Sequence, residues 1–229
     1  MKQTIIAMLL LLGAVFLFAQ SAEATIQEMN GTVELKLPGK ADWVPAKAGD
    51  RLEKSTIIST GFKSTAILAV GNSTMAVRPL TRLSLEALLL DRDNVETINV
   101  GLRTGRIQVN VNPPAGGRTN YTVQTPMATA SVRGTEFFMD TQNIHVFEGI
   151  VQYKPTGMQA FARPVSVNAG QDTWIDSETG NAVNPVIAAE TNRALPAMPG
   201  QAAAPAAEGS LKKSSSQGYF IVDVTLESE

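Results

Sequence analysis

Hydrophobic and polar residues alternate with a period of two along most of the chain. The alternation is clearest in Gly31–Leu37, Thr97–Leu102 and Arg106–Val111. Successive side chains of a β-strand point to opposite faces, so this period predicts strands with one buried face. Further short candidate strands are Ala66–Val70, Met75–Val77, Tyr121–Thr125, Phe137–Met139, Ile144–Phe147, Ile150–Tyr153, Val165–Val167 and Thr173–Ile175.

The predicted strands are short, and Gly, Asn, Asp and Pro separate them. Leu83–Leu90 is the one segment that fits a short helix, and it fits a strand equally well. A parallel α/β fold needs crossover connections of about a dozen residues or more, for which this spacing leaves no room. We therefore predict an all-β domain, built as a twisted solenoid-like or sandwich-like stack of short strands.

The first residues have the features of a secretory signal peptide. Met1-Lys2 gives a positive end, Ile5–Phe18 is almost wholly apolar, and Ala22-Glu23-Ala24 fits a small-x-small cleavage site. The apolar run is shorter than the roughly 20 residues of a membrane-spanning helix. We expect a signal helix over residues 1–24 and a periplasmic or secreted protein. A retained anchor is the alternative, and it would be the chain's only contact with the membrane.

The C-terminal part of the chain lacks the alternating pattern. We assign residues 25–182 to the β-domain, 183–217 to a flexible Ala/Pro-rich linker and 218–229 to a C-terminal strand. Within that last segment, Tyr219–Leu226 regains strand character. It either docks on a sheet edge of its own chain or offers Tyr219 and Ile221 to a partner by β-augmentation.

Composition narrows the chemistry. The 229 residues contain 19 Lys and Arg against 21 Asp and Glu, a net charge of −2 that does not favour nucleic acid or an anionic lipid surface. The chain has no cysteine, which excludes disulfides, zinc–thiolate sites and cysteine nucleophiles. Its only histidine, His145, lies between apolar residues in a predicted strand, where a structural role is more frequent than a catalytic one. We expect no enzymatic activity, no metal and no cofactor.

Two other interpretations stay open. Trp43 and Trp174 lie beside turn residues, and each either caps the end of the core or stacks on a sugar ring, as in a carbohydrate- or peptidoglycan-binding module. An envelope hydrolase would need a pair of carboxylates. The candidates for that pair are Glu136, Asp140, Glu148 and Glu178.

Several stretches, in order, resemble motifs of the FecR domain family. The most recognisable is Thr125–Phe137, which is similar to the pattern T-P-x-A-x-x-x-V-R-G-T-x-F. The other similar stretches are Trp43–Leu52, Ile58–Leu68, Thr81–Leu85, Gly105–Val109, Phe147–Val151 and Ala169–Gln171. The resemblance implies an all-β periplasmic domain that takes part in transmembrane signalling. We expect a free-standing, noncatalytic module for recognition or scaffolding, whose partner is an envelope protein or a cell-wall polymer.

The quartet Arg133-Gly134-Thr135-Glu136 within this motif is interpreted as structural. Gly134 permits a turn or a close backbone approach. Thr135 and Glu136 can hydrogen-bond backbone groups freed by the turn. Arg133 can bind neighbouring carbonyls or a carboxylate, so its removal is expected to lower thermal stability.

Overall fold

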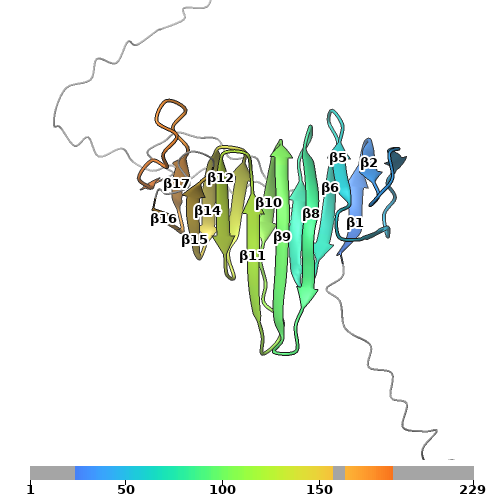
Figure 1. Ribbon diagram of the computed structural model, residues 1–229, viewed down its shortest axis with the longest axis horizontal. Coiled ribbons are helices and arrows are strands. Elements are labelled where there is room, and N and C mark those ends of the chain that lie inside the picture. The colour runs from blue at the N-terminus through green and yellow to red at the C-terminus, as the bar shows by residue number, and fades with distance from the viewer. Residues whose placement is uncertain (1–23, 157–162, 188–229) are drawn as a thin grey trace, which may run out of the picture.

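The computed structural model describes residues 24–156 and 163–187, and this part of the chain is built from β-strands and their connections (Figure 1). The all-β prediction is confirmed, whereas the expected signal helix and the C-terminal strand lie outside the described residues. The strands are β1 (Ala24–Asn30), β2 (Val33–Lys36), β3 (Val44–Pro45), β4 (Arg51–Leu52), β5 (Ile57–Thr60), β6 (Thr65–Val70), β7 (Ser73–Val77), β8 (Arg82–Leu90), β9 (Val95–Thr104), β10 (Arg106–Asn110), β11 (Arg118–Gln124), β12 (Ala128–Val132), β13 (Glu136–Asp140), β14 (Asn143–Glu148), β15 (Ile150–Pro155), β16 (Val165–Asn168), β17 (Gln171–Trp174) and β18 (Val186–Ile187).

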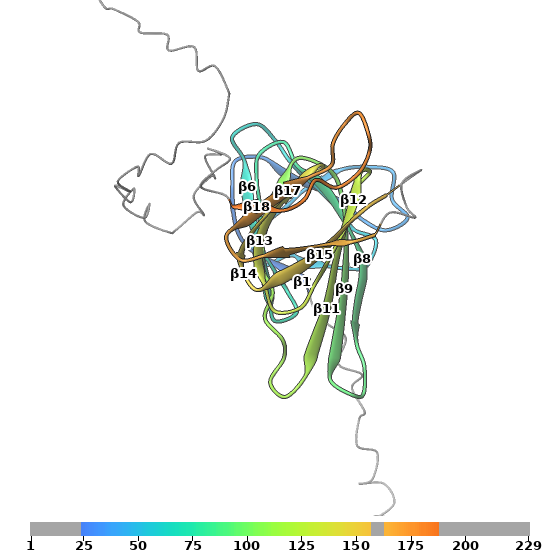
Figure 2. The same cartoon turned by 90° about the vertical axis from the view of Figure 1, so that its left-hand side faces the viewer.

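The strands form two open nine-stranded sheets that face each other (Figure 2). Sheet A has the order β18-β17-β14-β13-β10-β7-β6-β1-β4, and sheet B has the order β16-β15-β12-β11-β9-β8-β5-β2-β3. The chain alternates between the sheets and advances along both in the same direction, as the colour gradient in Figure 1 shows. The result is sandwich-like in cross-section and solenoid-like along its length.

Period-two sequences become strands here because each strand has one face in the core. β6 is the clearest case: Ala66, Leu68 and Val70 are buried between the sheets, while Ile67 and Ala69 lie on the outer face. The continuous apolar run of this strand hid that alternation in the sequence. Leu83–Leu90, which fitted a helix or a strand, is the strand β8.

The limits of the sheets differ slightly from the limits expected for the domain. Ala24 is buried in β1 and pairs with Val70 and Leu52, so cleavage after Ala24 would make Thr25 the first residue of the strand. At the other end, β18 pairs with β17 and extends sheet A to Ile187, beyond the expected boundary at residue 182. Among the described residues, no helix is long and apolar enough to cross a membrane.

Buried hydroxyl groups lie where the chain crosses from one sheet to the other. The Thr60 hydroxyl donates to the carbonyl of Arg78 at 2.6 Å and accepts from the amide of Thr81 at 3.0 Å. The Thr81 hydroxyl in turn donates to the carbonyl of Arg106 and accepts from its amide. Backbone groups freed at a crossing must find partners when they are buried. These threonines supply the partners and link successive crossings to one another.

Candidate functional site

The Arg-Gly-Thr-Glu quartet forms the crossing from β12 in sheet B to β13 in sheet A. Gly134 has a φ of +58°, the left-handed conformation that favours glycine. Thr135 is buried, and its hydroxyl bonds the carbonyls of Arg133 and Ile150, both at 3.3 Å. The Thr135 carbonyl accepts from the amide of Val111 at 3.0 Å. Hydrogen bonds of the quartet therefore link the crossing from β12 to β13 with the chain at Val111 and at Ile150, which is a structural role.

Glu136 and Arg133 have different roles in this corner. Glu136 accepts a hydrogen bond from the Gln108 side-chain amide at 3.1 Å. Arg133 is exposed, and its side chain makes no hydrogen bond or ion pair with the described residues. This differs from the expectation that Arg133 binds a carbonyl or a carboxylate. Arg133 follows the buried Val132 at the end of β12, so the alternation of the strand directs the Arg133 side chain away from the core.

Two substitutions at this crossing test the different roles of Thr135 and Arg133. Thr135→Val keeps the side-chain volume but removes the buried hydroxyl that bonds the Arg133 and Ile150 carbonyls, so we expect a loss of about 1 kcal/mol in the free energy of unfolding. Arg133→Ala is expected to change it by less than about 0.5 kcal/mol, because an exposed side chain without partners is removed. Urea denaturation followed by circular dichroism measures both. A larger loss for Arg133→Ala would contradict this assignment.

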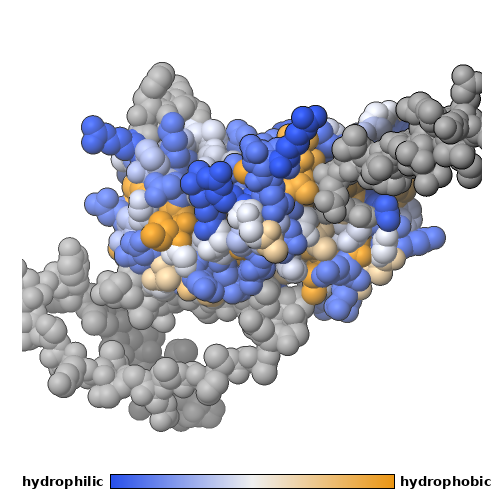
Figure 3. Space-filling view, turned by 90° about the horizontal axis from the view of Figure 1, so that it is seen from below, coloured by the Kyte–Doolittle hydropathy of each residue, from blue (hydrophilic) through white to orange (hydrophobic). Residues whose placement is uncertain are grey.

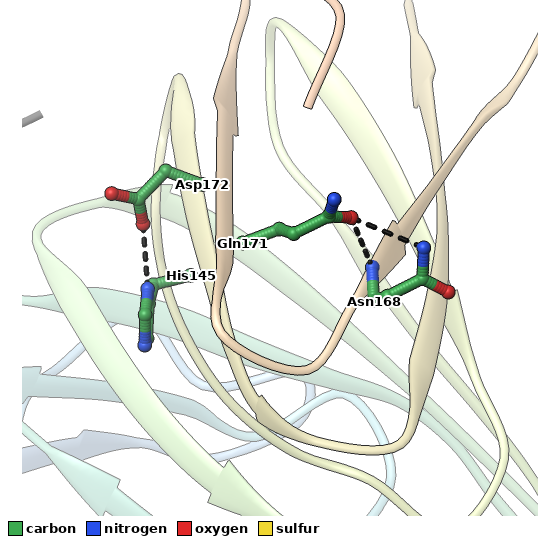
Figure 4. A network of polar contacts seen from close by, with 4 residues as sticks. All are labelled: His145, Asn168, Gln171 and Asp172. Atoms are coloured by element: carbon green, nitrogen blue, oxygen red, sulfur yellow. Dashed lines mark hydrogen bonds and ion pairs between the residues drawn. The ribbon is translucent and has the colours of Figure 1, made fainter. Parts of the chain in front are cut away.

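His145 is a buried, paired side chain. It lies on β14 opposite Asp172 of β17, and its Nδ1 is 2.6 Å from Asp172 Oδ1 (Figure 4). The His145 and Phe147 rings are in edge-to-face contact, with centroids 4.5 Å apart. His145 is 6% exposed and Asp172 is 2% exposed. The pair lies on the outer face of sheet A, since the residues on either side of His145 point into the core. His145 is therefore a buried strand residue whose ring nitrogen has a partner within the same sheet.

A second polar contact in Figure 4 explains the Ala169–Gln171 motif. The Gln171 side-chain oxygen accepts from the Asn168 backbone amide at 2.9 Å and from its side-chain amide at 3.1 Å. Gly170 takes a left-handed φ of +77°, and its amide donates to the carbonyl of Val146. The motif closes the turn between β16 and β17.

Glu136 and Asp140, the pair proposed for a hydrolase, do not have the spacing of two catalytic carboxylates. Glu136 and Asp140 lie four residues apart on the same face of β13, which separates them by about 13 Å along the strand. Two catalytic carboxyl groups of a glycosidase lie roughly 5–9.5 Å apart. Glu148 lies opposite Glu136, and Glu178 is in a turn beside Asp176. No group of three metal-ligating side chains occurs in residues 24–156 and 163–187.

Glu96 is a buried carboxylate that the sequence analysis did not single out. It is 2% exposed, because it lies in phase with the core residues Ile98, Val100 and Leu102 of β9. It accepts hydrogen bonds from the Asn72 amide and the Thr119 hydroxyl, both at 3.3 Å. Burial raises the pKa of Glu96, and the two hydrogen bonds partly oppose that rise. A charged residue in phase with apolar neighbours is the sequence signal that would have identified it.

The Glu96 environment predicts a pH-dependent stability. Because its pKa is higher in the folded protein, the stabilisation is present below the unfolded value, about 4.5, and is lost as the pH rises through the folded value. Glu96→Gln imitates the protonated state, so we expect a melting temperature roughly 2 °C higher than wild type at pH 7 and no difference at pH 4. Differential scanning calorimetry at both pH values measures this. The exposed Glu53→Gln variant, which should show no such pH-dependent difference, is the control.

The two tryptophans lie far from each other. Trp43 precedes β3 at one edge of sheet B, and the Arg82 guanidinium lies over its ring at 5.3 Å. Trp174 is in β17, near the opposite end of sheet A. The strands β3 and β17 belong to different sheets and lie at different ends of the sandwich, so the two tryptophans cannot line one sugar site. Tyr219 and Ile221, the other proposed contacts, lie outside the described residues.

The face of the described residues seen in Figure 3 is mostly hydrophilic, with separate hydrophobic patches. The exposed large hydrophobic residues are Leu37, Val44, Phe62, Leu80, Leu89, Phe147 and Ile150. Phe62 and Leu80 lie on adjacent crossings, where the Leu80 amide donates to the carbonyl of Gly61.

Comparison with known proteins gives a match of one segment to a family model and a partial similarity to solved structures. Residues 56–152 match the family model described as "FecR protein". Two crystal structures described as "a putative anti-sigma factor from Parabacteroides distasonis ATCC 8503", at 1.65 Å and 2.50 Å resolution, are similar with a TM-score of 0.45 and 12% identity. The similarity covers 57% of this chain and 59% of each of those chains. No curated protein sequence matches the chain.

Proposed function

Because the chain contains a FecR domain, we propose that it is a noncatalytic module of cell-envelope signalling that acts through contacts with another protein. The observation that carries the proposal is the match over residues 56–152, whose motif residues hold the crossings of the sandwich. Thr60, Thr81 and Thr135 each bind backbone carbonyls there. A recognition module needs a rigid frame that presents surfaces, and these motifs supply that frame.

Export is the second part of the proposal. The charged start, the apolar Ile5–Phe18 and the Ala22-Glu23-Ala24 site favour a signal peptide, and thus a periplasmic or secreted protein. A fusion of the full chain to alkaline phosphatase, which is active only outside the cytoplasm, tests this. We expect activity that is lost when Leu9–Leu12 is replaced by four aspartates. Equal activity from both fusions would contradict export.

The partner is proposed to be an envelope protein. The outer faces of the two sheets are one candidate contact area, and Tyr219 and Ile221 lie on one side of the C-terminal segment if it is extended. Photo-crosslinking in cells, with a photoreactive amino acid at position 221, should yield one discrete adduct with an envelope protein. Tyr219→Asp should reduce that adduct at unchanged protein level, while Ser215→Asp in the preceding polar stretch is the matched control.

The alternative is direct binding to the cell wall. Wild-type protein mixed with purified peptidoglycan sacculi should stay in the supernatant after centrifugation if the partner is a protein. Sedimentation with the sacculi that is lost in Trp43→Ala or Trp174→Ala would replace the proposed function with a peptidoglycan-binding module.

A further inference from the structure

The outer face of sheet B has a hollow over its central strands. The hollow has a volume of about 270 Å³ and is lined by residues of β8, β9 and the turn that follows β11. Its floor is Gly101, whose outward position carries no side chain, and the neighbours of Gly101 in the register are Ser84 of β8 and Gln124 of β11. A glycine inside a strand often marks a place where a ligand approaches the backbone closely.

Two side chains of opposite charge line this hollow. Glu86 lies where the pairing of β8 with β9 is irregular, and its carboxylate leans over Gly101, so that a Cβ at residue 101 would meet Glu86 Oε1. The Ser84 hydroxyl donates to the same oxygen at 3.3 Å. Arg103 lies two residues further along β9, on the same outer face, and its side chain is exposed. The negative charge is therefore placed over the floor of the hollow, and the positive charge stands at one side of it.

The polar groups of the hollow are available to a ligand. Among residues 24–156 and 163–187, the side chains of Arg103 and Gln124 have no hydrogen-bond or ion-pair partner, and the Glu86 carboxylate has only the Ser84 hydroxyl. Glu86, Arg103 and Gln124 are all exposed. Residues 101 and 103 are about 7 Å apart along the strand, which leaves room for a small molecule between the two charges.

We propose that this hollow binds a short peptide in its zwitterionic form, of the size of a dipeptide. The ammonium group of the peptide binds the Glu86 carboxylate, and its carboxylate binds the Arg103 guanidinium, which can hold both oxygens. The Gln124 side chain has a donor and an acceptor, which match the N–H and C=O groups of the peptide bond. An extended dipeptide is about 7 Å long, the same as the spacing of residues 101 and 103. This inference does not depend on the proposed signalling function.

The start of the Thr125–Phe137 motif forms one wall of the hollow. Pro126 lines the hollow, and Thr125 fixes the turn in which Pro126 lies. The Thr125 hydroxyl donates to the carbonyl of Thr141 at 2.8 Å and accepts from the amide of Ala128 at 2.9 Å. Proline has a fixed φ, so the turn beside Gln124 is already ordered before a ligand binds. An ordered site loses less conformational entropy on binding.

Isothermal titration calorimetry of the full-length chain with diglycine tests the proposal. We expect a dissociation constant on the order of 1 mM for so small a ligand. Glu86→Gln and Arg103→Gln should each weaken the binding at least about fivefold, because each removes one charge-assisted contact. The matched controls are Glu34→Gln and Arg118→Gln, which change exposed residues of sheet B outside the hollow and should leave the affinity for diglycine unchanged.

Probes that lack one charge assign the two ends of the ligand. N-acetyldiglycine lacks the ammonium group and glycylglycinamide lacks the carboxylate, so the wild type should bind each at least about fivefold more weakly than diglycine. Glu86→Gln should bind N-acetyldiglycine as the wild type does, because the contact with the ammonium group is already missing. For the same reason, Arg103→Gln should bind glycylglycinamide as the wild type does.

Gly101→Ala tests the hollow while both charges are kept. The added Cβ would lie 2.6 Å from Ser84 Oγ and against the Glu86 carboxylate, which are the ends of side chains that can rotate away. The domain should therefore stay folded, and we expect diglycine binding to weaken at least about threefold. Absence of diglycine binding to the wild type up to about 10 mM would overturn the proposal. Equal affinities of the wild type, Glu86→Gln and Arg103→Gln for diglycine, or of the wild type for all three probes, would also overturn it.

Discussion

Gly105→Ala is expected to lower the free energy of unfolding by about 3 kcal/mol. Gly105 lies at the crossing from β9 to β10 with a φ of +88°, a conformation that costs an alanine about 1–2 kcal/mol. A Cβ at this position would also lie against Thr81 Cα and 2.7 Å from the Leu80 carbonyl oxygen. These are largely backbone atoms, so they cannot rotate away, and overpacking of this kind adds about 1–3 kcal/mol.

A matched glycine separates the two contributions. Gly39 has a similar φ of +70°, but a Cβ there would have no heavy atom within 4 Å. Gly39→Ala is therefore expected to lose only about 1 kcal/mol, the conformational part of the effect. Guanidinium denaturation of both variants gives the difference. Equal losses would mean that the crossing loops are not held as closely as the structure shows.

His145→Ala is expected to lower the free energy of unfolding by about 3 kcal/mol. The substitution leaves the Asp172 carboxylate buried on the outer face of sheet A without the histidine at 2.6 Å. Removing one partner of a buried pair typically costs about 3–5 kcal/mol, and the further contacts of Asp172 place the expected loss at the lower end of that range. Chemical denaturation at pH 7 measures the loss.

The double variant His145→Leu with Asp172→Leu distinguishes this cause from lost packing. Replacing both members of a buried pair with apolar residues is often neutral, so we expect the double variant to be more stable than His145→Ala. If the double variant is as unstable as the single one, the imidazole stabilises the sheet through its ring contacts, including the one with Phe147.

The sequence alone predicted the all-β fold class, most of the strands and the turn at Gly134. Period-two patterns located most strands, and the Thr125–Phe137 motif marked a corner whose glycine takes the expected left-handed turn. These features are local. A strand with one buried face needs alternating apolar and polar residues, and a tight crossing needs a glycine and a hydroxyl, whichever strands lie beside it.

Only the tertiary structure decided the partners and the degree of exposure. It paired His145 with Asp172, buried Glu96, left Arg133 in solvent and placed Trp43 and Trp174 at opposite ends. It also placed β11 parallel to β9, a neighbour that no local pattern predicts. Alternation states which side chains share a face, but what covers that face depends on segments distant in the sequence. The burial of a polar group therefore becomes known only when the sheets are assembled.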